Sequence, residues 1–293
     1  MEKKDEIPGY KVEGFLGKGA FGMALLLSSI DDKNKKAVAK KVTIQSQEDQ
    51  HLAAEEALLL RSINNPNIVR YTDFHIELGR HCYIIMEFCD GGDLKGRIEH
   101  YQKSGEKLQT GRSLIWITQL ALKYCHERNI LHRDLKPENI FVMKDNLTAK
   151  LGDFGVARKL SFACQLASTV CGTPLNFSPE LIEGKPYAKP TDIWALGCVI
   201  YELTFLEHPF LGPNETGNLF QLGQKILAVN YPRKNCYLGL LADKCLSRKP
   251  ENRFSIQQIL ADPNLSRIQG KFNRNIETSK IYVSELMACL KLN

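Results

Sequence analysis

The sequence predicts an α+β fold of two lobes, with a small five-stranded antiparallel lobe that carries one helix and a larger, mainly helical lobe. Residues 10–88 contain short apolar runs separated by turn residues, a pattern typical of strands. After Asp90-Gly91-Gly92 the apolar residues recur with a period of about 3.6, which indicates helices. The 293 residues, 43% of them hydrophobic, suit one large domain or two lobes that share a cleft.

The small lobe, at about residues 10–88, is expected to contain five strands, at 10–16, 23–29, 36–44, 68–75 and 82–87. One helix interrupts them at residues 49–63, where good helix formers separate the apolar positions, and it stops before Asn64-Asn65-Pro66. A hinge is expected at about residues 87–92.

The large lobe is expected at about residues 93–262, which completes a domain at 10–262, with helices at 93–103, 111–129, 191–206, 218–228, 238–246 and 255–260. The apolar run from Trp194 to Leu206 is too short to span a membrane and carries Glu202, so it predicts a buried helix. Residues 263–293 are expected to form a helical extension that packs on the large lobe, with partner binding as the alternative.

Composition excludes several classes of protein. The net charge of +6 is spread along the chain, which gives little support to nucleic-acid binding. The nine cysteines have no CxxC or His/Cys ligand spacing, so we expect reduced thiols in the cytoplasm and no zinc site. The charged start has no secretory signal, Glu2 stands where myristoylation needs glycine, and no segment is expected to cross a membrane.

A glycine-rich segment, Gly17-Lys18-Gly19-Ala20-Phe21-Gly22, is a weak signal alone because dinucleotide-binding folds and ordinary turns also contain this spacing. Here a strand-like run follows it, whereas a dinucleotide fingerprint leads into a helix. The context therefore favours a hairpin that closes over phosphates, with Gly17, Gly19 and Gly22 letting backbone amides approach them.

Lys40 is the candidate for contacting the α and β phosphates, because it fits the V-A-I-K register within Ala37-Val38-Ala39-Lys40. Lys41 is its rival. An acidic residue of the following helix should hold this lysine, and both Glu55 and Glu56 qualify by composition. We choose Glu56 because it lies ten residues before Pro66, a spacing that resembles the one between this acidic residue and the helix-ending proline in proteins that carry the V-A-I-K motif.

The most informative segment is His132-Arg133-Asp134-Leu135-Lys136-Pro137-Glu138-Asn139, followed by Asp153-Phe154-Gly155. Asp134 can accept or orient a hydroxyl proton, and Lys136 can stabilise a transferring phosphoryl group. Asn139 and Asp153 offer the oxygen ligands that Mg²⁺ prefers. Capping and turn roles explain so dense a set poorly. The segment therefore predicts phosphoryl transfer from ATP with Mg²⁺.

These motifs, in this order and with Ser178-Pro179-Glu180, resemble the protein kinase superfamily over residues 10 to about 262. Met86-Glu87-Phe88-Cys89-Asp90-Gly91-Gly92-Asp93-Leu94, Gly172-Thr173-Pro174 and Asp192-Ile193-Trp194-Ala195-Leu196-Gly197 resemble the NIMA-related kinases. The lysine two residues after Asp134 resembles the serine/threonine form. The resemblance implies a bilobal serine/threonine protein kinase that uses ATP and Mg²⁺ on protein substrates in the cytoplasm, and it also allows a cytoskeletal association.

The resemblance also assigns an adenine site. It makes Met86 the gatekeeper and implies that the backbones of Glu87 and Cys89 bind adenine. The base would be enclosed by Leu16, Ala24 and Val38 on one side and by Phe141 on the other. Kinases usually carry valine at position 24, so the smaller Ala24 opposite the bulkier Phe141 indicates a compensated exchange that keeps the slot about one ring thick.

Regulation is implied by the segment between Asp153 and Glu180. Thr169 resembles the activating phosphosite of NIMA-related kinases, with Ser168 as second choice, and Arg133 would pair with the added phosphate. The phosphate would come from an activating kinase or from autophosphorylation. Thr173 resembles a residue that positions the catalytic Asp and Lys.

The segment near the end of this loop departs from the family in one place and matches it in another. Leu175-Asn176-Phe177 replaces the usual aromatic residues, which puts in doubt the preference for the substrate residue just beyond the phosphoacceptor. Glu180 and Arg253 resemble a pair that ties the loop to the large lobe, with an exposed surface pair of little value as the alternative.

Two other readings compete. A pseudokinase or scaffold would keep the fold and act by binding, but it predicts the loss of at least one of Lys40, Glu56, Asp134, Asn139 and Asp153, and all are present. A small-molecule kinase of similar fold is disfavoured by Ser178-Pro179-Glu180, which in the resembling family belongs to a platform for protein substrates.

Overall fold

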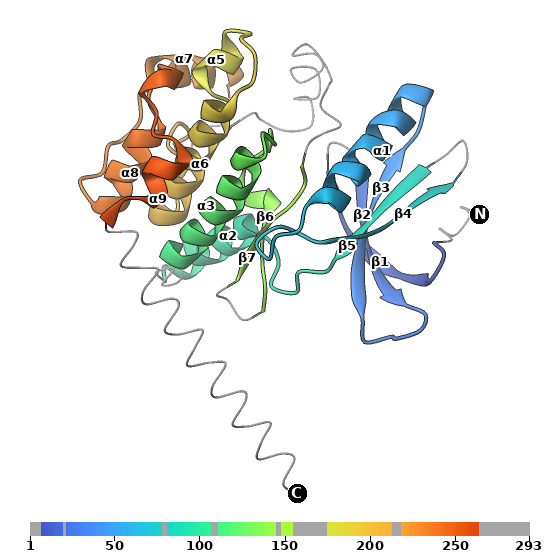
Figure 1. The fold of residues 1–293 in the computed structure, drawn as a ribbon. Helices are drawn as coiled ribbons and strands as arrows, with labels where there is room; N and C mark the ends of the chain where they lie inside the picture. Colours follow the sequence, from blue (N-terminus) through green and yellow to red (C-terminus); the bar gives the residue numbers. More distant parts are fainter. Residues whose placement is uncertain are drawn as a thin grey trace, which may run out of the picture.

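The computed structural model describes residues 7–19, 22–77, 81–106, 111–144, 148–154, 175–212 and 218–263. A sheet with one long helix forms a small lobe, and most of the helices gather in a second, larger lobe (Figure 1). The predicted fold class is confirmed: the small lobe has a five-stranded antiparallel sheet, and the large lobe is mainly helical.

The sheet of the small lobe has the strand order β1-β2-β3-β5-β4, and every neighbouring pair is antiparallel. Its strands are β1 (Tyr10–Gly19), β2 (Gly22–Ser29), β3 (Lys36–Thr43), β4 (Tyr71–Glu77) and β5 (His81–Glu87). The fourth strand begins three residues later than predicted. Ile68 is not part of it, because this residue forms a parallel bridge to Leu151 of the large lobe instead.

Strand β3 shows how the sheet orients its side chains. Ala37 and Ala39 are buried in a core shared with Leu25, Leu27 and other apolar residues of the small lobe. Successive residues of a strand point to opposite faces, so Val38 and Lys40 face away from this core. The alternation therefore turns Lys40 toward the cleft between the lobes.

Helix α1 (Gln47–Ser62) begins at a capping box, in which the Ser46 hydroxyl accepts from the Asp49 amide and the Asp49 carboxylate accepts from the Ser46 amide. It buries Ala53, Glu56 and Ala57 among other residues. Glu56 is a charged residue in that row, only 1% exposed, which already marks it as a residue with a partner.

The large lobe is built around helix α6 (Lys189–Phe205), which is buried at every position from Thr191 to Leu203 (Figure 1). This confirms the buried helix predicted from the apolar run. Around it lie α2 (Leu94–Ser104), α3 (Gly111–Glu127), α5 (Pro179–Ile182), α7 (Leu219–Ala228), α8 (Tyr237–Cys245) and α9 (Ile256–Leu260). Observed and predicted ends of the longer helices agree within two residues.

Several short elements were not predicted. They are β6 (Ile140–Val142), β7 (Ala149–Leu151), α5 and the 3₁₀ turns at Pro137–Asn139 and Pro250–Asn252. Three or four residues are too few to show a period, so hydrophobic patterning cannot reveal them. Strands β6 and β7 pair antiparallel, with Asn139 directly before β6 and Asp153 two residues after β7, so the pairing brings the two predicted metal ligands to the same end.

Some predictions fall outside the described part of the chain. The extension is described only at residue 263, and Thr169, Ser168 and Thr173 lie within 155–174, outside the described ranges. Six cysteines in the described part are free, at positions 82, 89, 125, 198, 236 and 245. No helix among the described residues is both long and apolar enough to cross a bilayer.

Candidate active site

Lys40 lies between two carboxylates that come from different lobes. Its Nζ is 2.7 Å from Glu56 Oε1 on α1 and 2.7 Å from Asp153 Oδ1, which follows β7. Burial disfavours the ammonium, but the two carboxylates more than offset this effect and raise the pKa of Lys40. Asp153 responds in the opposite way: burial would raise its pKa, but Lys40 lowers it. These shifts favour the charged forms of Lys40 and Asp153. Burial raises the pKa of Glu56, and the charge of Lys40 acts against that shift.

The rivals of Lys40 and Glu56 lie elsewhere. The Lys41 side chain belongs to the other face of β3, with Nζ 5.9 Å from the centroid of the Tyr83 ring. Glu55 lies one position along α1 and pairs with the exposed His51 at 3.2 Å. The structure thus brings Lys40 and Glu56 into the cleft and leaves the two alternatives outside this contact.

Asp134, Lys136 and Asn139 form one hydrogen-bonded group. Lys136 Nζ is 3.0 Å from Asp134 Oδ2, and the Asn139 amide donates to the same oxygen at 3.0 Å and to the Asp134 carbonyl at 2.7 Å. The short turn at Pro137–Asn139 makes this possible, because it folds the chain back so that position 139 returns to position 134. The group presents a carboxylate and an ammonium to the same cleft.

His132 connects this group to Asp153. The Asp134 amide donates to His132 Nδ1 at 3.3 Å, so Nε2 carries the proton and donates to the Gly152 carbonyl at 3.0 Å. Burial lowers the pKa of His132, which keeps the ring in this neutral form. The ring also packs against Phe154, with centroids 4.8 Å apart. One imidazole therefore fixes the spacing between the two acidic loops.

Asp192 positions the same loop, and the sequence analysis did not assign it a role. Its carboxylate accepts from the backbone amides of His132 and Arg133, both at 3.1 Å. It also accepts from the Tyr187 hydroxyl at 2.7 Å and lies 2.8 Å from His126 Nε2. Burial would raise the pKa of Asp192, but its polar partners, His126 first, lower it. The sequence offers one indication of this role, because Asp192 is a lone carboxylate in the first turn of an otherwise apolar helix.

Two residues of the site have left-handed backbone conformations that only glycine adopts easily. They are Arg133, with φ of 68°, and Asp153, with φ of 52°. Arg133 is held by the bond from its amide to Asp192, and Asp153 is held by Lys40. Such strain is found where surrounding contacts fix a functional geometry.

The donor set suits a magnesium ion that also binds phosphate. Asn139 and Asp153 lie close together, because the amide of Gly152 donates to the Asn139 carbonyl at 2.9 Å. Among the described residues no group of three or more His, Cys, Asp or Glu side chains could hold a metal. Mg²⁺ does not need one, because it is usually bound by one or two carboxylates together with phosphate oxygens and water.

A cleft of about 930 Å³ lies between the lobes. It is lined by most of the residues predicted to hold a nucleotide, namely Leu16, Gly17, Gly22, Ala24, Val38, Lys40, Met86, Glu87, Cys89 and Phe141. Gly19 lies at the end of β1, paired with Gly22. The side chain of Glu87 accepts from Lys150 Nζ at 2.8 Å and from the Arg70 amide at 2.7 Å.

Gly22 shows why this part of the cleft needs glycine. Its φ is +146°, and a Cβ there would lie 2.1 Å from the Lys41 carbonyl oxygen. A side chain at position 22 would therefore push the end of β2 away from β3. The first residue of β2 can therefore lie this close to β3 because it has no side chain.

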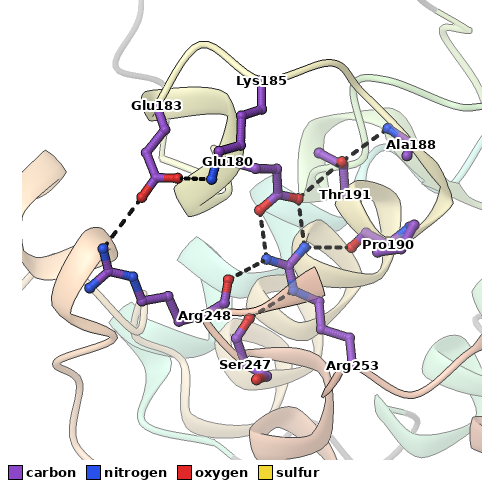
Figure 2. Close-up of polar contacts among 9 residues, drawn as sticks. All are labelled: Glu180, Glu183, Lys185, Ala188, Pro190, Thr191, Ser247, Arg248 and Arg253. Atoms are coloured by element: carbon purple, nitrogen blue, oxygen red, sulfur yellow. Dashed lines mark hydrogen bonds and ion pairs between the residues drawn. The ribbon is translucent and has the colours of Figure 1, made fainter. Parts of the chain in front are cut away.

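Glu180 and Arg253 form a buried ion pair. The alternative considered from the sequence, that these two residues form an exposed pair on the surface, is therefore wrong. The guanidinium grips the carboxylate with both terminal nitrogens, at 2.7 and 2.6 Å (Figure 2). The side chain of Arg253 is 0% exposed and that of Glu180 is 6% exposed. Through this pair, the short helix α5 is joined to the chain that leads into α9.

The chain is similar to known proteins over both of its lobes. Residues 10–265 match the family model described as protein kinase domain. Over 267 residues the chain is 40% identical to the serine/threonine-protein kinase Nek5 of Homo sapiens, covering 90% of this chain and 37% of that protein. It is also 40% identical over 265 residues to Nek1 of Mus musculus, covering 88% of this chain and 21% of that protein.

The chain therefore spans 37% of the length of Nek5 and 21% of the length of Nek1. What the match covers is the two-lobed region that contains the cleft. The match over residues 10–265 shows that the chain belongs to the protein kinase family, and the Nek relatives confirm its resemblance to the NIMA-related kinases.

Proposed function

We propose that this chain is a serine/threonine protein kinase that transfers the γ-phosphoryl group of Mg²⁺-ATP to hydroxyl groups of protein substrates. The observation that carries the proposal is the convergence of Lys40, Asp134, Lys136 and Asn139 with Asp153 on one cleft. Phosphoryl transfer depends mainly on positioning and on charge stabilisation, and these residue types supply both.

Each residue has a distinct task in this proposal. Lys40, held by Glu56, would neutralise the inner phosphates, and Lys136 would stabilise the group in transfer. Asn139 and Asp153 would hold Mg²⁺, which neutralises charge on the β and γ phosphate oxygens when bound. Asp134 would orient the substrate hydroxyl and accept its proton, since its carboxylate is kept in place by Asn139 and Lys136.

The adenine site is proposed on the same cleft. Leu16, Ala24 and Val38 would cover the base on the side of the small lobe, and Phe141 would support it from the large lobe. Met86, Glu87 and Cys89 belong to β5 and the segment that follows it, where backbone groups can reach the edge of the base. This arrangement gives an apolar slot with polar groups at one end, as expected for a nucleotide site.

One assay tests the activity. The purified chain is incubated with labelled ATP, Mg²⁺ and a generic serine- and threonine-rich protein, and the products are hydrolysed to identify the phosphorylated amino acid. We expect phosphoserine or phosphothreonine from the wild type and none from Asp153→Ala. Asp31→Ala is the matched control, because it makes the same chemical change in an exposed turn.

The competing functions predict other results. A scaffold would bind nucleotide without phosphorylating the protein, and a small-molecule kinase would leave the protein unlabelled while consuming ATP with another acceptor. Phosphotyrosine as the product would contradict the serine/threonine assignment. An Asp153→Ala variant that works at the wild-type rate would refute the proposed role of the cleft.

Activation-loop phosphorylation is proposed as the switch. A phosphate on Thr169 would add charge that Arg133 can pair with, and Arg133 lines the cleft directly before Asp134. Thr169→Ala is expected to lower the phosphorylation rate and leave ATP affinity largely intact. Ser168→Ala tests the second choice, and we expect a rate near that of the wild type from it. An undiminished rate in purified Thr169→Ala would exclude the switch at Thr169. An activating kinase or autophosphorylation would supply the phosphate.

Location and partners complete the proposal. We propose a cytoplasmic protein that acts on other proteins, with cytoskeletal association as implied by its relatives' family. The free cysteines of the described residues are consistent with a reducing compartment. Imaging of a fluorescent fusion tests this, and accumulation in the secretory pathway would contradict it.

A further inference from the structure

An ion pair outside the proposed catalytic group lies on the large-lobe wall of the cleft. Lys95 Nζ is 2.8 Å from Glu202 Oε1. Lys95 belongs to the first turn of α2 and Glu202 to the buried helix α6. Both residues line the same cleft as Asp134. The pair therefore borders the space that a substrate would enter.

The carboxylate of this pair is costly for the fold. Glu202 is 4% exposed on a helix whose neighbours are mostly apolar. Burial raises its pKa, and the hydrogen bond and charge of Lys95 act against that shift. A buried carboxylate is destabilising unless a cation meets it, so this position needs a positive group whether or not a substrate is bound.

The lysine that meets the carboxylate reaches it from the cleft. Its side chain remains 31% exposed, whereas that of Glu202 is 5% exposed. Burial lowers the pKa of Lys95, but Glu202 raises it, with smaller contributions from Glu138 and Glu99. Glu202 is the carboxylate that contacts the ammonium, at 2.8 Å. Without Lys95, this wall would be an acidic pocket open to the cleft.

The pocket lies where a protein substrate would approach. Leu175, Asn176 and Phe177, which follow the activation loop, line the same cleft. Asn176 donates from its side chain to the Leu135 carbonyl at 3.2 Å, and Leu135 directly follows Asp134. The pair and this segment therefore line the same cleft as Asp134, which would orient the phosphoacceptor hydroxyl. A basic side chain of a substrate is the group that an acidic pocket at this place would bind.

We propose that Lys95 is a specificity-determining residue, which occupies the acidic pocket of Glu202 and thereby removes a preference for arginine or lysine at one substrate position. The inference rests on the proposed function. Wild-type substrates gain no affinity from a basic residue there, since the carboxylate is already paired. The ammonium of Lys95 takes the place that a basic residue of a substrate would occupy, so substrates with a basic residue at this position are not favoured.

Peptide libraries that vary one position at a time around a fixed serine test this. Lys95→Met keeps the length of the side chain and removes its charge, so we expect arginine at one position to improve kcat/KM by about tenfold or more, the size of a charged hydrogen bond. The control is Lys103→Met, an exposed lysine at the end of the same helix, which should leave the preference as in the wild type.

Reciprocal variants keep the test sharp if Lys95→Met folds poorly. Glu202→Gln frees the ammonium, and we expect it to shift the same position toward aspartate and glutamate. The double variant Lys95→Met/Glu202→Gln removes both charges and should prefer neither sign. If each variant shows the wild-type preference at every position, the inference is overturned.

A binding measurement distinguishes a failure of this inference from a failure of the proposed function. Labelled peptides with arginine or alanine at the selected position are titrated into the wild type and Lys95→Met, without ATP. A gain in affinity for the arginine peptide in Lys95→Met supports the pocket even where no phosphorylation occurs, and in that case the proposed activity alone fails. Equal affinities for the two peptides in Lys95→Met, beside normal phosphorylation by the wild type, overturn the pocket alone.

Discussion

Arg253→Met would test how strongly the large lobe depends on one buried contact. The guanidinium uses all its donors: it bonds Glu180 twice and the carbonyls of Pro190, Ser247 and Arg248 at 2.8, 2.8 and 3.3 Å (Figure 2). Methionine keeps an unbranched apolar side chain but supplies no donor. The Glu180 carboxylate would stay buried with the Thr191 hydroxyl, 3.1 Å away, as its remaining side-chain donor in Figure 2.

The expected loss is large because the charge left behind cannot reach water. Breaking a buried pair by removing one partner costs about 3 to 5 kcal/mol, which for a domain of this size lowers Tm by roughly 6 to 20 °C. Arg248→Met is the matched control. Its guanidinium contacts Glu183 at 3.3 Å and is 60% exposed, so its loss should cost about 0 to 1 kcal/mol.

Thermal and urea unfolding of both variants beside the wild type measure the difference. Burial would raise the pKa of Glu180, but Arg253 lowers it below its ordinary value of 4.5. A lowered pKa stabilises the fold above pH 4.5 and loses that effect as the pH falls, so the gap between wild type and Arg253→Met should narrow in acid. If Arg253→Met is no less stable than Arg248→Met at pH 7, the reasoning from burial is wrong.

Three further changes probe the cleft and its support. Ala24→Val should weaken ATP binding measured by calorimetry, because the larger side chain narrows a slot already narrowed by Phe141; an unchanged affinity would count against the compensated exchange. Tyr187→Phe should lower the free energy of unfolding by about 1 to 3 kcal/mol, because the buried Asp192 loses a donor, and a loss below that range in urea would contradict this. Glu56→Ala should lower kcat about a hundredfold, since Lys40 keeps only Asp153 as a partner; activity near the wild-type rate would show that α1 does not position Lys40.

Local patterns in the sequence were enough to predict most of the fold. The placement of Lys40 on the face of β3 opposite to that of Ala39 follows from a period of two, which short windows reveal. The choice of Glu56 over Glu55 followed from its spacing to Pro66. Helix ends agreed within two residues because their caps and apolar periods are also local.

Contacts between distant parts of the chain could not be read in this way. Asp192 accepts from a loop 59 and 60 residues before it, and Arg253 meets a carboxylate 73 residues away. Such partners depend on how the helices of the large lobe pack. The burial of Glu180 and Arg253 is likewise a property of that packing, so only the resemblance, and no local pattern, favoured this pair over the exposed alternative.

The bridge between Ile68 and Leu151 restricts how the cleft can open. The Val69 amide donates to the Leu151 carbonyl at 2.9 Å, and the Leu151 amide donates to the Asn67 carbonyl at 2.8 Å, so backbone bonds join the segment after α1 to β7. Asp153 lies two residues beyond this junction. We expect a rotation of one lobe against the other to pivot near this junction, so that β1 and β2 would move further than Asp153. The proposed nucleotide would then exchange at the mouth of the cleft while the contacts of Lys40 with Glu56 and Asp153 stay in place.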